Sequence, residues 1–315
     1  MRFKRIFITG GTGYIGKSLL DYRLRHPDLL AGAELVLLAR DPRAFKTRYP
    51  RLARQPGVSF IKGDVRSFEP PSGVFDAVVS AASPVQGAAP DDEITEVNIE
   101  GTRRLIQLAD KMGVQRILMT SSGAVYGRCM NPPDEDSALK PLTAYGVAKM
   151  KAERMLVDSG ISTGIARIFA EIGPYLPRLR GFAVGNFIQN CINKEPITIK
   201  GDGRAYRSYL FADDLIEWLS AILECDDGSR AYNVGSPHGI TILDLAKMVS
   251  RICGGGGDIC VLGGNDGSPP EHYYPNVCRA IDELAVKMHF DLETAIEKTY
   301  KIIGSEAFFH KQQET

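Results

Sequence analysis

The chain has 315 residues, 44% of them hydrophobic, and its 38 Lys and Arg residues balance 38 Asp and Glu residues. This composition excludes disordered, collagen-like and coiled-coil chains and allows one large or two interlocked globular domains. Because the formal net charge is +0, a bulk electrostatic grip on nucleic acid or anionic lipid is not expected. We expect a small-molecule partner instead.

The N-terminal segment predicts a β-strand over residues 5–9 and an amphipathic helix over residues 14–25. The turn that joins them is rich in glycine and comprises Gly10, Gly11, Thr12, Gly13, Tyr14, Ile15 and Gly16. Glycine lets the backbone approach a pyrophosphate closely, and the helix N-terminus supplies amide donors and partial positive charge. This context predicts a dinucleotide-binding site, with a tight turn that binds no ligand as the alternative.

The second predicted strand, residues 34–39, is followed by Arg40 and Asp41. An arginine at this point pairs well with a ribose 2′-phosphate, so the sequence favours NADP over NAD. Two alternatives remain. Arg40 is a solvated charge at a strand end in the first, and Asp41 takes the ribose hydroxyl in the second.

Asp64 follows a third predicted strand over residues 58–62. Its carboxylate is a candidate partner for the adenine amine, and an ordinary surface-turn aspartate is the alternative. Further strands are expected over residues 77–81 and 116–120, separated by a helix over residues 92–112.

Hydroxyl groups follow the strand at residues 116–120, where Ser121 and Ser122 lie at the carboxyl edge of the expected sheet. Ligands bind at that edge in folds of this kind. The next helix, expected over residues 143–159, carries Tyr145 and Lys149 four residues apart and therefore on one face. A nearby ammonium favours the phenolate, so Tyr145 is predicted to donate and accept a proton.

The alternation of strands and helices predicts an α/β fold, a Rossmann-type doubly wound parallel sheet, with its sixth strand over residues 162–168. After Phe169 the alternation breaks, and only a helix over residues 182–193 is expected before a helix at 212–224 and a strand at 231–234. We expect a dinucleotide-binding domain of residues 1–172 with 207–235 returning to it. Residues 173–206 and 236–315 would form a smaller, mostly C-terminal α/β substrate domain.

Taken together, the ordered motifs resemble the extended short-chain dehydrogenase/reductase family, in the branch that acts on nucleotide sugars. The resemblance covers nearly the whole chain, and its motifs are residues 9–16, 63–65, 98–102, 121–127, 145–149 and 201–209. It is highly specific for the family and much less so for the reaction.

The resemblance implies roles for individual residues. The implied catalytic residues are Ser122, Tyr145 and Lys149, and the last also holds the nicotinamide ribose. Besides the glycine turn and Arg40, the implied coenzyme contacts are Asp64, Val65, Ala81 and Ala82. The implied substrate contacts are Ser83, Ser122, Gly123, Tyr145, Asn186 near the base, and Arg207 and Arg279 at the phosphates. Structural roles remain the alternatives for Asn186, Arg207 and Arg279.

Gly123 and Ala124 follow Ser122, where the sugar 4,6-dehydratases of this family carry Asp and Glu. Dehydration is therefore not expected. The sequence favours hydride transfer at C4 of a nucleoside-diphosphate sugar, as a 4-keto sugar reductase, with a 4-epimerase as the alternative. A coenzyme-sensing regulator is a distant alternative, because it would have lost part of the catalytic set.

The remaining expectations concern partners and compartment. The family resemblance implies a homodimer formed through the helices at 92–112 and 143–159. We expect no membrane span and no metal site, because no apolar run reaches about 18 residues and the His and Cys residues are scattered. We expect a cytoplasmic protein with six reduced cysteines, which are Cys129, Cys191, Cys225, Cys253, Cys260 and Cys278.

Overall fold

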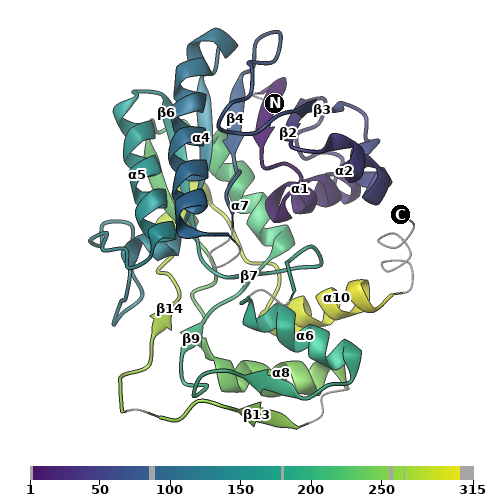
Figure 1. Cartoon of the computed structure of the whole chain (residues 1–315), viewed down its shortest axis with the longest axis vertical. Coiled ribbons are helices and arrows are strands. Elements are labelled where there is room, and N and C mark those ends of the chain that lie inside the picture. The colour runs from purple at the N-terminus through teal and green to yellow at the C-terminus, as the bar shows by residue number, and fades with distance from the viewer. Residues whose placement is uncertain (1–2, 85–88, 179–180, 255–257, 266, 306–315) are drawn as a thin grey trace.

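The computed structural model describes residues 3–84, 89–178, 181–254, 258–265 and 267–305. It has two lobes, which lie one above the other in Figure 1. The larger is a parallel sheet with helices on both faces, called here the sheet lobe. The smaller, called the second lobe, contains helices around a separate apolar core.

Seven parallel strands form the sheet, in the order β11-β6-β5-β4-β1-β2-β3. They are β1 (Arg5–Thr9), β2 (Glu34–Ala39), β3 (Val58–Lys62), β4 (Ala77–Ser80), β5 (Arg116–Ser122), β6 (Ser162–Ile168) and β11 (Arg230–Val234). Every residue of β5 is buried, as expected for a central strand covered on both faces. The predicted doubly wound α/β fold is confirmed.

The strand order reverses at β1, which lies between β2 and β4. Connections on the two sides of this point run over opposite faces of the sheet, so they leave a crevice at the carboxyl ends of β1 and β4. The glycine turn follows β1 and therefore lies at this crevice.

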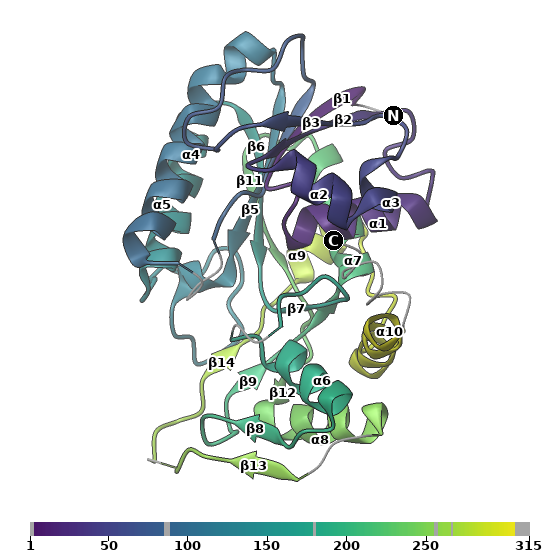
Figure 2. The same ribbon diagram turned by 45° about the vertical axis from the view of Figure 1, so that its right-hand side comes forward.

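Helices cover the two faces of the sheet unequally (Figure 2). One face packs against α4 (Asp91–Met112) and α5 (Ala144–Asp158), whose leucines form a core with Phe7 and Val36. The other face packs against α1 (Tyr14–Arg25), α7 (Ala212–Glu224) and α9 (Cys278–Leu284). Two short helices, α2 (Pro42–Arg48) and α3 (Pro50–Ala53), lie beside α1.

In the described part of the chain, the second lobe contains three helices and several short strands. Its helices are α6 (Ala183–Asn193), α8 (Ile242–Cys253) and α10 (Leu292–Gly304). Its strands are β8 (Ile197–Ile199), β9 (Tyr206–Arg207), β12 (Ile240–Thr241), β13 (Ile259–Val261) and β14 (His272–Tyr273). A two-stranded pair, β7 (Glu171–Ile172) with β10 (Leu210–Phe211), lies between the lobes.

Most predicted boundaries agree with the structure within two residues. The strand expected to end at residue 81 ends at Ser80, and the strand expected to end at residue 120 continues to Ser122. The expected helix at 143–159 loses both end residues, because Thr143 and Ser159 are its caps. The run of glycines at residues 254–257 predicts a flexible turn. Gly254 caps α8 in the left-handed conformation, while residues 255–257 lie outside the described residues.

Candidate active site

The glycine turn is packed too tightly for side chains. A Cβ on Gly10 would lie 2.4 Å from the carbonyl oxygen of Ala81, and one on Gly16 would lie 2.1 Å from that of Gly11. Gly10 also has a φ of 69°, which favours glycine. No side chain caps α1 at Gly13, so the amides of its first turn face the crevice with the partial positive charge of the helix end.

These features fit a dinucleotide. The backbone can approach a pyrophosphate at Gly11 and Gly13, and the Tyr14 hydroxyl is buried without a hydrogen-bond partner of ordinary geometry among the described residues. Thr9 fixes the facing loop, because its hydroxyl accepts hydrogen bonds from the amides of Ala81 and Ala82 at 3.2 and 3.3 Å.

The residues predicted to set coenzyme choice lie together beyond β2 and β3. Arg40 is exposed, and the Asp41 carboxylate accepts a hydrogen bond from the Ala44 amide at 3.0 Å as the N-cap of α2. Asp64 accepts hydrogen bonds from the Arg66 side chain at 2.8 and 2.9 Å. Arg66 and, to a smaller extent, Arg40 lower the pKa of Asp64. Its carboxylate is therefore already engaged, and its role toward adenine stays a prediction.

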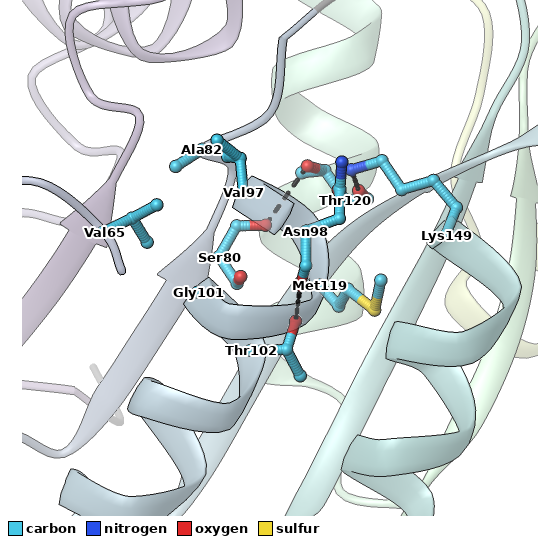
Figure 3. Close-up of a pocket in the computed structure, with 10 residues that line it drawn as sticks. All are labelled: Val65, Ser80, Ala82, Val97, Asn98, Gly101, Thr102, Met119, Thr120 and Lys149. Carbon is cyan, nitrogen blue, oxygen red and sulfur yellow. Dashed lines mark hydrogen bonds between the residues drawn. The ribbon is translucent and has the colours of Figure 1, made fainter. Parts of the chain in front are cut away.

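A small pocket at the carboxyl ends of β4 and β5 joins several predicted site residues (Figure 3). Its lining includes Val65, Ala82, Asn98, Thr120 and Lys149. Ser83 lies beside it and accepts a hydrogen bond from the Asn98 amide at 3.1 Å. The fold thus brings residues 65, 82, 98 and 149, which belong to separate sequence motifs, to the lining of one pocket.

Tyr145 and Lys149 lie on α5, which Thr143 caps by accepting a hydrogen bond from the Gly146 amide at 3.1 Å. The Lys149 ammonium donates to the carbonyl of Thr120 at 2.8 Å, as Figure 3 shows, and lies 5.7 Å from the Tyr145 ring centre. Burial lowers the pKa of Lys149 to about 8. The pKa of Lys149 is therefore closer to neutral pH than the pKa of a solvent-exposed lysine.

The pKa of Tyr145 is raised, not lowered, in this structure. Burial is the largest cause, Tyr273 adds to it, and the interaction with the Ser122 hydroxyl acts in the opposite direction. The expectation that Lys149 acidifies the phenol is not met here, because the ammonium is directed to the Thr120 carbonyl. That acidification stays a prediction for the enzyme with coenzyme bound.

Two further residues interact with Ser122 or Tyr145 and were not predicted from the sequence. The Tyr273 hydroxyl lies 3.5 Å from the Ser122 hydroxyl. Glu171 is close enough to raise the pKa of Tyr14, Tyr145 and Tyr273. Neither lies in a motif of the sheet lobe, and both come from two-residue strands that carry no periodic signal.

The residues predicted to contact the phosphates and the base of the nucleotide sugar lie in different parts of the structure. Arg207 on β9 donates to Glu271 at 2.7 Å and lies 5.4 Å from the Tyr273 ring centre, at the cleft. Asn186 is half-buried on α6 in the second lobe. Arg279 donates to Asp136 at 2.7 Å and is 3.7 Å from Glu135, and none of its described contacts reaches Arg207.

One cluster of potential metal ligands occurs among the described residues. Asp214, Glu217 and His289 have ligand atoms close enough for one cation. Asp214 accepts a hydrogen bond from the His289 amide, however, and Glu217 pairs with the His289 ring at 3.1 Å.

All six cysteines are free thiols. Within the described ranges, no helix has the length and apolarity that a membrane span needs.

Curated proteins and solved structures are similar to this chain. The chain is 29% identical over 293 residues to UDP-glucuronic acid decarboxylase 1 of Arabidopsis thaliana, covering 89% of this chain and 65% of that protein. It therefore spans less than two thirds of that curated relative.

Solved structures share the fold. The UDP-glucuronic acid 4-epimerase of Bacillus cereus, in complex with UDP-glucuronic acid and NAD, superposes with a TM-score of 0.82 at 23% identity, covering 95% of this chain and 98% of that one. The UDP-glucose 4-epimerase of Thermotoga maritima, with UDP-glucose, gives 0.80 at 20% identity, covering 98% and 99%. The model of the NAD dependent epimerase/dehydratase family matches residues 6–235. The chain belongs to this family, a group of extended short-chain dehydrogenases/reductases, as its motifs predicted.

Proposed function

We propose that the protein is an NAD-dependent 4-epimerase of a UDP-hexose. The observation that carries the proposal is the convergence of Ser122, Tyr145 and Lys149 at the carboxyl edge of β5, beside the crevice at β1 and β4. The solved structures with the same fold include 4-epimerases in complex with UDP-sugars. Their ligands support a UDP-sugar as the substrate class.

Each of the three residues has a task at C4 of the sugar. When bound, the nicotinamide ring accepts a hydride and returns it. Tyr145 takes the proton of the C4 hydroxyl when the keto sugar forms. It returns the proton after the keto sugar has rotated in the cleft and presents its other face. Ser122 donates a hydrogen bond to the same oxygen. Lys149 stabilises the tyrosinate once its ammonium is drawn toward the phenol.

The residues after Ser122 argue against reactions that need a further acid. Gly123 and Ala124 offer no ionisable group, and a Cβ on Gly123 would lie 2.7 Å from the Phe169 ring. Decarboxylation is the activity named for the Arabidopsis relative, but it needs a site that accepts a sugar carboxylate. The cleft instead contains the carboxyl group of Glu171.

The second candidate is a 4-keto sugar reductase that uses NADP. Arg40 favours it, because this exposed guanidinium lies near the acidic Asp64 at the end expected to hold the adenosine ribose. In that case Arg40→Ala would weaken NADPH binding about tenfold or more, because hydrogen bonds to charged groups contribute about 1.5–3 kcal/mol. NAD binding would change little.

One assay separates the two candidates. The purified protein is incubated with UDP-glucose and NAD, and the sugar product and the absorbance of reduced coenzyme are followed together. The epimerase forms UDP-galactose without net reduction of coenzyme. A reductase forms no UDP-galactose. In a second incubation, with NADPH and a 4-keto nucleotide sugar, it oxidises one NADPH for each sugar that it reduces. Absence of both reactions, with a folded protein that binds coenzyme, would contradict the proposed class.

We also propose the two domains predicted above and a homodimer built through α4 and α5. The faces of these helices form a groove lined by Asp91, Thr95, Ile99, Ala144 and Lys151. Leu142 beside it is 74% exposed. Analytical ultracentrifugation tests the dimer, and Leu142→Glu is expected to shift the equilibrium to monomer.

A further inference from the structure

Glu171 is a carboxyl group in the active-site cleft that the proposed reaction does not use. It lies on β7, directly after the sixth strand of the sheet, where its backbone pairs with Leu210. Successive side chains of a strand point to opposite sides. Since Ile172 is fully buried in the core of the second lobe, Glu171 points the other way, toward the cleft.

Three phenols interact electrostatically with this carboxyl, and each comes from a different part of the site. Tyr14 lies at the glycine turn, Tyr145 on α5 and Tyr273 on β14, and Glu171 raises the pKa of all three. The Tyr14 hydroxyl lies 3.1 Å from the position of a Cβ on Gly173, two residues after Glu171, and the Tyr273 hydroxyl lies 3.5 Å from that of Ser122. A sugar held for reaction at Tyr145 therefore lies beside Glu171.

Among the residues that the structure describes, no positive charge offsets the Glu171 carboxylate. Burial alone raises its pKa to about 8, and within the described chain no side chain donates a hydrogen bond to it. Arg207 lies against the same Tyr273 ring, but its guanidinium is paired with Glu271. The carboxyl of Glu171 is thus left to interact with a ligand.

We propose that Glu171 determines specificity in the sugar subsite, where it accepts a hydrogen bond from a hydroxyl of a neutral hexose and excludes hexuronic acids. A sugar carboxylate beside Glu171 would place two like charges together in a partly desolvated cleft, which is strongly unfavourable. A neutral sugar hydroxyl supplies the donor that the carboxyl lacks. This inference rests on the proposed function, because it needs a UDP-sugar in the cleft.

The test measures binding of UDP-glucose and UDP-glucuronic acid to the NAD-loaded protein by calorimetry at pH 9, where Glu171 is ionised. We expect the wild type to bind UDP-glucose more tightly by about tenfold or more. In Glu171→Gln the ratio is expected to shrink to within about threefold, mainly because UDP-glucuronic acid binds better. Glu297→Gln, which removes an exposed carboxylate on α10, is the matched control and should keep the wild-type ratio.

A pH series on the wild type gives a second, independent measurement should the variant fold poorly. Within the described ranges, the charged or titratable groups that interact with Glu171 are the three phenols, whose raised pKa values keep them protonated below pH 9. Lys149 also titrates near pH 8, but it does not contact Glu171 and acts on both ligands. The preference for UDP-glucose should therefore grow between pH 6.5 and pH 9.

The possible outcomes are distinct. Equal ratios in wild type and Glu171→Gln, or a preference that is the same at both pH values, would overturn the role of Glu171 and leave the proposed function intact. Tighter wild-type binding of UDP-glucuronic acid would also overturn it. If neither UDP-sugar binds the folded, NAD-loaded wild type, the proposed function fails and this inference fails with it.

Discussion

On the coenzyme side of the cleft, the surface is formed by closely packed backbone. Gly10 packs against the backbone of Ala81, and Gly16 packs against that of Gly11. Neither contact leaves room for a Cβ. On the sugar side, Glu171, Arg207 and Tyr273 come from three strands of two residues each, and side chains form the surface. Under the proposed function, the first side would bind the coenzyme, which is common to the reactions of this family, and the second would bind the sugar, which differs between them. Changes on the two sides should therefore have different kinds of effect.

The largest effect is expected where the two sides meet. Tyr145→Phe removes the proton donor but keeps the ring, so the turnover rate should fall by roughly 10²–10⁴-fold while coenzyme binding is unchanged. Steady-state kinetics and coenzyme titration measure both quantities. Tyr300→Phe, on α10 in the second lobe, is the control. A Tyr145→Phe enzyme with more than a tenth of the wild-type rate would contradict the acid/base role.

On the coenzyme side, a single methyl group should be enough to damage binding. Gly16→Ala forces a Cβ against the Gly11 carbonyl, and overpacking of this kind costs about 1–3 kcal/mol. We expect coenzyme affinity to fall by about 10- to 100-fold, measured by fluorescence titration. Gly201→Ala, in the second lobe with open space around its Cβ, should bind coenzyme normally. Equal behaviour of the two variants would refute the contrast between the two sides.

On the sugar side, loss of a positive charge should weaken binding of the substrate and leave binding of the coenzyme unchanged. Arg207→Gln is expected to raise the Kd for UDP-glucose about tenfold, since hydrogen bonds to charged groups contribute about 1.5–3 kcal/mol. Arg251→Gln removes a surface arginine paired with Glu293 and should have no effect. Unchanged affinity in Arg207→Gln would show that Arg207 serves only its ion pair with Glu271.

The smallest expected effect is on stability. Burial raises the folded-state pKa of Glu171 to about 8, whereas the unfolded carboxyl titrates near pH ~4.3. The unfolded state therefore loses its proton first, so stability falls as the pH rises between these values and stays low above them. Glu171→Gln lacks this penalty, and its Tm should exceed that of the wild type by a few degrees at pH 8.5, with a smaller difference at pH 5. The reverse order of the differences would contradict the buried carboxyl.

The sheet lobe was largely predictable because its elements are long and periodic. The pattern of β1, the glycine turn and α1 was correct to the residue, as was α7. Helix capping and strand extension account for the small boundary differences at Thr143 and Ser122. The motif residues met where parallel strands end, because that edge is fixed by topology.

The second lobe was predicted poorly because its strands are only two or three residues long and pair across large sequence separations. β9, for example, pairs with β12 and β14, which are more than thirty residues away. The helix α8 is strongly amphipathic and was detectable, since Leu245, Ala246, Val249 and Cys253 recur at helical spacing and are buried. Glu171 and Tyr273 had no such signal, and only the three-dimensional structure shows that Tyr273 lies 3.5 Å from the Ser122 hydroxyl and that Glu171 acts electrostatically on Tyr145.

A buried polar network behind β5 has a consequence for anyone who alters this protein. Arg167 donates to Glu153 at 2.9 Å and to the Tyr126 hydroxyl at 2.9 Å, and Ser121 donates to Glu153. Removing one member leaves the others buried and unpaired, which is typically worse than removing the whole set. Substitutions here are therefore non-additive, and protein engineers should vary these positions jointly rather than one at a time.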